Sequence, residues 1–324
     1  MERTRRIGVL GTLVWDRIWL HDASSPREGW GGIAYSLAAW SAASPPGWEV
    51  VPIVKLGSDL EAQADELLAE LPHLAQGGTR VVPETSNRVE LRYTDHAHRG
   101  ERLTGGVLPW GWEELAPILA SLDALYPNFI TGDEMGLPDA ERLRHEFGGP
   151  IYTDLHSLLL GHGPDGLRCA RPLGEWNRWV ACFDALQTNH SELATQAQSV
   201  GRDPWSFAGQ SLQCGPALFV VTLGADGAGY VISDGAASDP LSWPARESST
   251  AGQHSGRVPP PEGPAAGDPT GCGDVWGSTL FGELLAGAEL EPAMASAHRA
   301  AARKMAHPGV SGLYMHLAQG SFSA

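Results

Sequence analysis

Short apolar runs alternate with longer segments of helical periodicity along this chain. The apolar runs predict buried strands at 6–11, 50–54, 129–130, 151–152, 185–186 and 218–222. The helical pattern predicts helices at 60–71, 112–124, 138–147, 204–212, 274–287 and 292–306. Strands that alternate with helices usually build a parallel sheet that is covered on both faces. The pattern therefore predicts a three-layer α/β/α fold with a central, mostly parallel sheet.

A strict alternation of polar and apolar residues marks a smaller β element. In segment 88–94 the apolar positions Val89, Leu91 and Tyr93 fall on one face. Segment 101–104 could return as a hairpin partner, and segment 13–20 is a looser candidate for a further strand. The sequence thus predicts one domain over residues 1–324, with extra strands from about 12–20 and 86–105.

Composition and charge narrow the function classes. The chain has 324 residues, 42% of them hydrophobic, and a net charge of −16. Nucleic acid and anionic membranes would be repelled by this charge, so neither is expected as a partner. The four cysteines form no Cys-x-x-Cys pair. The first 25 residues match neither a signal peptide nor a membrane span. We expect a cytoplasmic protein with reduced thiols.

A glycine-rich segment at 267–274, Gly-Asp-Pro-Thr-Gly-Cys-Gly-Asp, runs directly into an apolar helix. Gly271 and Gly273 allow a tight turn with uncovered amides, and the first amides of a helix attract anions such as phosphate. Asp274 is the carboxylate in this corner and could accept a hydroxyl proton. The plainer alternative is an ordinary capped helix after a loop.

This segment resembles the Asp-Thr-x-Gly-Ala-Gly-Asp motif of the ribokinase-like (PfkB) carbohydrate kinases, with Pro269 in place of Thr and Cys272 in place of Ala. Four further segments match motifs of that family in the family's order. They are Gly-Gly-x-x-x-Ser at 31–36, Leu-Gly-Ser-Asp at 56–59, Asn-His-Ser-Glu at 189–192 and Thr-Leu-Gly-Ala-Asp-Gly at 222–227.

The resemblance implies an ATP-dependent kinase and a role for each matched residue. Asp274 would be the general base, and the amides of Gly271, Cys272, Gly273 and Asp274 the anion hole. The acceptor would be bound by Asp16, Gly31, Gly32 and Ser36, and the nucleotide by Asn189, Glu192, Thr222, Gly224 and Gly227. Glu192 would also bind Mg²⁺ through water. A monovalent cation such as K⁺ could lie near Asp268, Thr270 and the 307–312 turn.

Several alternatives stay open at this point. Asp16 could pair with an arginine instead of substrate hydroxyls. Ser36 stands where the family usually has Asn, so the acceptor could differ from ribose or fructose. In that family such strands form a lid over the sugar, so the resemblance implies a small β lid from about 12–20 and 86–105, and the plainer alternative is a β extension at the sheet edge. The charged residues at 88, 90 and 92 could contact the acceptor or simply face water. Besides a sugar or polyol kinase, the chain could be a nucleoside kinase or a non-catalytic sugar-binding regulatory protein.

Other sites are weaker predictions. No Gly-x-x-x-x-Gly-Lys-Ser/Thr segment of a P-loop kinase occurs in the sequence. His96 and His98 are two residues apart, which is a weak metal signal.

Trp15 and Trp19 are expected on the outer face of the small β element, where a second copy of the chain would cover them. A homodimer through this element is therefore expected.

Overall fold

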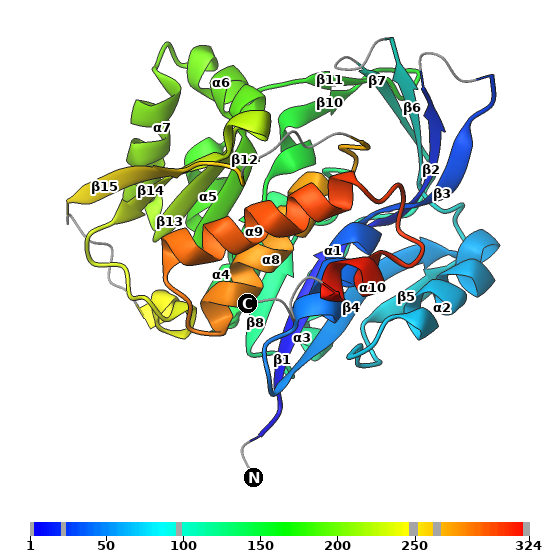
Figure 1. Cartoon of the computed structure of the whole chain (residues 1–324), viewed down its shortest axis with the longest axis horizontal. Coiled ribbons are helices and arrows are strands. Elements are labelled where there is room, and N and C mark those ends of the chain that lie inside the picture. The colour runs from blue at the N-terminus through cyan, green and yellow to red at the C-terminus, as the bar shows by residue number, and fades with distance from the viewer. Residues whose placement is uncertain (1–2, 21–23, 95–98, 246–251, 262–266, 320–324) are drawn as a thin grey trace.

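The computed structural model describes residues 3–20, 24–94, 99–245, 252–261 and 267–319. His96 and His98 lie outside the described residues. Within these ranges the chain forms a large central sheet, helices on both of its faces, and a smaller sheet at one end (Figure 1). No described helix is both long and apolar enough to span a membrane.

The central sheet consists of two groups of strands, in the orders β5-β4-β1-β8 and β9-β12-β13-β14-β15. Parallel bridges from Leu125 to Ile151 and from Asn128 to Asp154 join β8 to β9, so the two groups are continuous. All pairings are parallel except those of the last two strands. The strands are β1 (Arg5–Gly11), β4 (Trp48–Gly57), β5 (Thr79–Val82), β8 (Ala124–Pro127), β9 (Tyr152–Asp154), β12 (Ala185–Asn189), β13 (Leu218–Thr222), β14 (Ala228–Ser233) and β15 (Gln253–Val258).

Two hydrophobic cores lie on the two faces of this sheet, because neighbouring residues of a strand point to opposite sides. Ile7 and Val9 belong to one core and Leu10 to the other. The first core packs against α1 (Ile33–Ala43), α2 (Glu61–Glu70), α8 (Cys272–Leu285), α9 (Leu290–Met305) and α10 (Leu313–Ala318). The second packs against α3 (Trp112–Leu119), α4 (Leu137–Glu146), α5 (Trp176–Ala181), α6 (His190–Ser199) and α7 (Pro204–Ser211). The predicted three-layer α/β/α fold is confirmed.

Two predicted elements around residue 124 are wrong in position. The helix predicted at 112–124 ends at Leu119, and the strand predicted at 129–130 is β8, which ends at Pro127. The apolar run continues past Pro127 because Phe129 is fully buried in the core without being part of a strand. A continuous apolar run therefore located the buried segment but not the strand within it.

The smaller sheet has the strand order β3-β2-β6-β7 (Figure 1). Its strands are β2 (Leu13–Trp19), β3 (Arg27–Gly32), β6 (Arg88–Tyr93) and β7 (Arg99–Thr104). The sequence Arg-Glu-Gly-Trp-Gly-Gly of β3 has no apolar alternation, so the pattern did not predict this strand. It forms by antiparallel pairing with β2.

The two faces of the smaller sheet differ in character. Ile18, Val89 and Leu91 are buried on the inner face. On the outer face Trp15 lies edge-on to Trp30, with ring centroids 5.3 Å apart. The charged residues of β6 share this outer face, because each pairs in register with an outer residue of β2. Arg88 pairs with Asp59 at 2.7 Å, Arg92 pairs with Glu90 at 2.7 Å, and the Arg92 guanidinium lies 4.9 Å from the Trp19 ring. These side chains thus face away from Asp16, and the alternative of acceptor contacts through them is wrong.

Candidate active site

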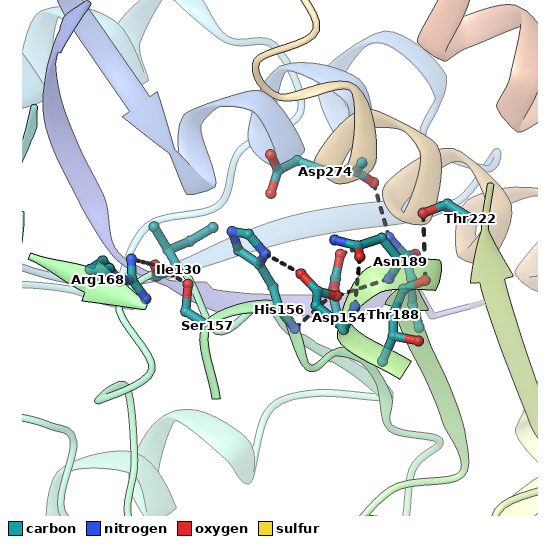
Figure 2. Close-up of polar contacts among 12 residues, drawn as sticks. Ile130, Asp154, His156, Ser157, Arg168, Thr188, Asn189, Thr222 and Asp274 are labelled. Carbon is teal, nitrogen blue, oxygen red and sulfur yellow. Dashed lines mark hydrogen bonds and ion pairs between the residues drawn. The ribbon is translucent and has the colours of Figure 1, made fainter. Parts of the chain in front are cut away.

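The site lies where neighbouring parallel strands end. Asn128 follows β8, Asp154 is the last residue of β9, and Asn189 and Thr222 are the last residues of β12 and β13. The carboxyl ends of adjacent parallel strands share one edge of a sheet, where ligands commonly bind in α/β folds. The register puts Asn128 beside Asp154 and Asn189 beside Thr222. The N-terminus of α8 lies over the same edge (Figure 2).

The loop before α8 is held in shape by its glycines. Gly271 caps the helix with φ of +81°, in the left-handed region that favours glycine. A Cβ on Gly271 would overlap the ring of Tyr35, which is almost fully buried in α1. The Cys272 amide donates to the carbonyl of Pro269 at 3.1 Å. This amide is therefore engaged inside the loop, whereas Gly273 and Asp274 belong to the first helical turn, whose amides have no intrahelical partner.

Asp274 is fixed by a residue that the sequence analysis missed. Asn128 is fully buried, and its Nδ2 donates to Asp274 Oδ1 at 2.6 Å and to Ser36 Oγ at 3.2 Å. The Asn128 Oδ1 atom is buried and has no hydrogen-bond partner among the described residues. Ser36 is fully buried too, and Asn128 links it to Asp274. Burial raises the pKa of Asp274, which makes its carboxylate a better proton acceptor.

A cluster of charged side chains faces Asp274 from the sheet edge. Figure 2 shows Asp274 above His156 and Asp154, which lie at and just after the end of β9. His156 Nδ1 lies 3.0 Å from Glu192 Oε1, and the Gln187 amide donates to Asp154 Oδ2 at 2.7 Å and to the carbonyl of Gly273 at 3.2 Å. Gln187 therefore connects the sheet edge to the first turn of α8.

The pKa values in this cluster are strongly shifted. Burial raises the pKa of Asp154 to about 8, against the nearby His156, and the charges of Glu192 and Asp274 add to the rise. Burial by itself would lower the pKa of His156, but its hydrogen bond to Glu192 and the three surrounding carboxylates raise it to about 9. His156 is therefore a cation at neutral pH, and it lies among the side chains of Asp154, Glu192 and Asp274.

The predicted nucleotide residues surround the same edge. Asn189 and Glu192 cap α6 reciprocally: Glu192 N donates to Asn189 Oδ1 at 3.0 Å, and Asn189 N donates to Glu192 Oε2 at 2.9 Å. Gly224 and Gly227 both have positive φ in the turn between β13 and β14. A Cβ on Gly227 would overlap the carbonyl of Val258 in the neighbouring strand.

The described side chains of the site could bind Mg²⁺ only through water molecules. Among the described residues no group of three or more His, Cys, Asp or Glu side chains could hold a metal ion. Both carboxylate oxygens of Glu192 have partners in Asn189 and His156. Mg²⁺ usually keeps several waters and is shared between one or two carboxylates and substrate phosphates. Glu192 matches this kind of site.

The predicted monovalent cation site does not fit. The Asp268 carbonyl accepts from Lys304 Nζ at 3.2 Å. One carboxylate oxygen of Asp268 accepts from the Thr270 amide at 3.0 Å, and the other pairs with Arg27. The oxygens of Asp268 are thus already bound to donors of this chain, which corrects the expectation of K⁺ at Asp268 and Thr270.

On the acceptor side, Asp16 is buried in β2, and a Cβ on Gly31 of the paired β3 would overlap its carboxylate. A side chain at position 31 would thus displace the Asp16 carboxylate. Gly31 and Gly32 are the last residues of β3, and α1 begins at Ile33. A cavity of about 340 Å³ borders Asp16, Tyr35, Arg27 and the 308–311 turn, and Asp274 is not among the residues that line it.

Comparison with known proteins agrees with this arrangement. Residues 167–314 match the sequence profile of the pfkB family carbohydrate kinases. No curated protein matches the chain by sequence. Ribokinase from Thermotoga maritima has 18% identity and a TM-score of 0.72, with 96% of this chain and 97% of that one covered.

Two further solved structures are similar over almost their whole length. A sulfate complex of a pyrophosphate-dependent kinase in the ribokinase family has 17% identity and a TM-score of 0.70, covering 94% of this chain and 96% of that chain. Burkholderia thailandensis nucleoside kinase in complex with inosine has 17% identity and a TM-score of 0.69, covering 98% of this chain and 99% of that chain. At these identities the likeness establishes a ribokinase-like fold. The profile match over residues 167–314 and this fold together support a relationship to the PfkB carbohydrate kinases.

Proposed function

We propose that the protein transfers the γ-phosphoryl group of ATP to a hydroxyl group of a small sugar or related polyol. The observation that carries the proposal is the placement of Asp274 in the first turn of α8, with its carboxylate fixed by Asn128 and its pKa raised by burial. A carboxylate with a raised pKa beside uncovered helix amides supports general-base catalysis next to an anion hole.

The proposed reaction needs one proton transfer and one exchange of bonds at phosphorus. The acceptor hydroxyl gives its proton to Asp274 while its oxygen forms a bond to the γ-phosphorus. The bond between that phosphorus and the bridging oxygen breaks, and ADP leaves. The amides of Gly271, Gly273 and Asp274 would stabilise the transferring group, and the His156 cation would offset its charge. Mg²⁺, when bound through water by Glu192, would supply further charge neutralisation.

The binding roles follow from the same placement. Asp16 would accept hydrogen bonds from acceptor hydroxyls, with the glycines at 31 and 32 beside it. Thr222, Gly224 and Gly227 would shape the nucleotide groove. The Asn128 Oδ1 atom is a buried acceptor without a partner among the described residues. Such an atom is costly to leave unsatisfied, so we expect it to receive a hydrogen bond in the reacting complex.

A coupled assay of ADP release over sugars, polyols and nucleosides tests the proposal, with pyrophosphate as an alternative donor in a parallel phosphate-release assay. Asp274→Asn should reduce turnover by about 10²–10⁴-fold and leave nucleotide binding nearly unchanged, because the amide keeps the shape but cannot accept the proton.

Asp203→Asn is the matched control. Asp203 is exposed and caps the start of α7, and Asn caps equally well. Acceptor binding without turnover for every donor would instead indicate a non-catalytic binding protein. Wild-type turnover in Asp274→Asn, when chemistry limits the rate, would refute the assigned role.

A further inference from the structure

Lys304, in the last turn of α9, is a fully buried ammonium group beside the phosphate-binding loop. Its Nζ donates to the Asp268 carbonyl at 3.2 Å and lies 5.2 Å from the centre of the Tyr35 ring. A buried charge is expensive unless it is compensated. Here the compensation comes from the carbonyl, the face of the aromatic ring and the nearby Asp268 carboxylate.

These contacts reach both ends of the loop. Asp268 opens the loop, and its amide donates to the carbonyl of Met305, next to Lys304. Tyr35 lies against Gly271, which closes the loop as the cap of α8. An ammonium that holds the Asp268 carbonyl and the Tyr35 ring therefore supports the loop at its first residue and at its cap.

We propose that Lys304 is a built-in replacement for a monovalent cation, a positioning residue whose ammonium holds the anion hole in shape so that phosphoryl transfer needs no K⁺. This inference rests on the proposed kinase function. It follows from the occupied oxygens of Asp268, because an ion placed there would meet the ammonium of Lys304 and the guanidinium of Arg27 at close range. Two like charges in a partly buried site repel each other strongly.

The first test uses the wild-type protein. Turnover is measured at constant ionic strength with K⁺, Na⁺ or tetramethylammonium as the only monovalent cation. We expect the kcat values to agree within about twofold, since the charge comes from the chain itself. Activation by K⁺ of about tenfold or more would overturn the proposal. The melting temperature is recorded in the same buffers, so that cation binding is visible without any turnover.

The second test removes the ammonium. In Lys304→Ala we expect kcat to fall about ten- to hundredfold, the loss associated with a hydrogen bond to a charged group, with little change in KM. Added K⁺ or methylammonium should then restore kcat and raise the melting temperature of this variant. Lys304→Met removes the charge but fills the space, so kcat should fall without rescue.

Lys55→Met is the matched control, because Lys55 is the other lysine of the chain and is also buried. It pairs with Glu114 at 2.7 Å and lies 4.8 Å from the Trp110 ring. This variant should not become responsive to cations. The proposal would be refuted if Lys304→Ala folds and either keeps the wild-type kcat or does not respond to added cations.

If neither Lys304 variant folds, the wild-type cation series decides alone. If no acceptor gives turnover, the kinase proposal fails, whereas the melting temperatures still report whether Lys304→Ala has gained a cation site and wild type has not. Failure of the two proposals is thus distinguishable.

Discussion

Two glycines of the α8 loop should respond oppositely to the same substitution. Gly271 has φ of +81° and no room for a Cβ beside Tyr35, whereas a Cβ on Gly273 would meet nothing within 4 Å. In Gly271→Ala the left-handed backbone costs about 1–2 kcal/mol and the overlap with the ring about 1–3 kcal/mol. The free energy of unfolding should therefore fall by about 2–5 kcal/mol.

The corresponding shift in melting temperature follows from the size of the chain. An unfolding entropy of about 2.1 cal/mol/K per residue gives about 0.7 kcal/mol/K for a protein of this length, so Tm should fall by about 3–7 °C. Differential scanning calorimetry measures this shift. Gly273→Ala should be as stable as wild type or more stable by up to about 1 kcal/mol, because alanine is favoured over glycine in a helix.

Turnover completes the comparison. Gly273→Ala places a methyl group beside an amide that we propose to hold the transferring phosphoryl group, so kcat should fall although stability does not. Gly271→Ala measured well below its Tm reports how far a distorted cap also lowers kcat. An unfolding free energy of Gly271→Ala within about 0.5 kcal/mol of wild type would show that Tyr35 yields freely, and the reasoning would be refuted.

Three further measurements follow from the same geometry. The raised pKa values of His156, to about 9, and Asp154, to about 8, mean that the folded state holds protons that the unfolded state releases. Stability from His156 is therefore lost as pH rises from about 6.5 to about 9, and stability from Asp154 as pH rises from about 4 to about 8. Tm should fall as pH rises from about 6.5 to about 9, and the fall should be smaller in His156→Gln; an equal fall in both proteins would contradict the His156 assignment. Asp16→Ala should lower kcat/KM for the acceptor by about ten- to hundredfold at an unchanged KM for ATP, and unchanged acceptor kinetics would return Asp16 to a structural role. If the smaller sheet joins two copies, light scattering should give a dimer for wild type and a monomer for Trp15→Glu, whereas a wild-type monomer at micromolar concentration would exclude this interface.

Most of the fold could be predicted from the sequence because its strands are short apolar runs between amphipathic helices. The α/β/α layering follows from the alternation of strands with helices. The strict alternation of polar and apolar residues at 88–93 predicted β6. The strand β3 could not be predicted in this way, since Arg27–Gly32 is polar and glycine-rich and becomes a strand only through its pairing with β2.

The site was predictable where a role depends on a local motif and hidden where it depends on contacts between distant segments. Asp274 and Gly271 stand out in sequence because the loop and the helix start are contiguous. Asn128 acts on Asp274 across 146 positions, so no window of sequence contains both. Lys304 did leave a signal: it falls in the buried stripe of α9 with Ala297 and Met294, where a lysine is unexpected.

The burial of both lysines has a practical consequence for following local opening of the protein. Lys304 lies beside Tyr35 in one core and Lys55 beside Trp110 in the other, with exposures of 0% and 6%. Amine-reactive esters should acylate each side chain only when its own layer opens. Pulse labelling with such a reagent, read by peptide mass spectrometry, would thus report the opening free energies of the two layers separately in one sample. A chain with many surface lysines would not allow this measurement.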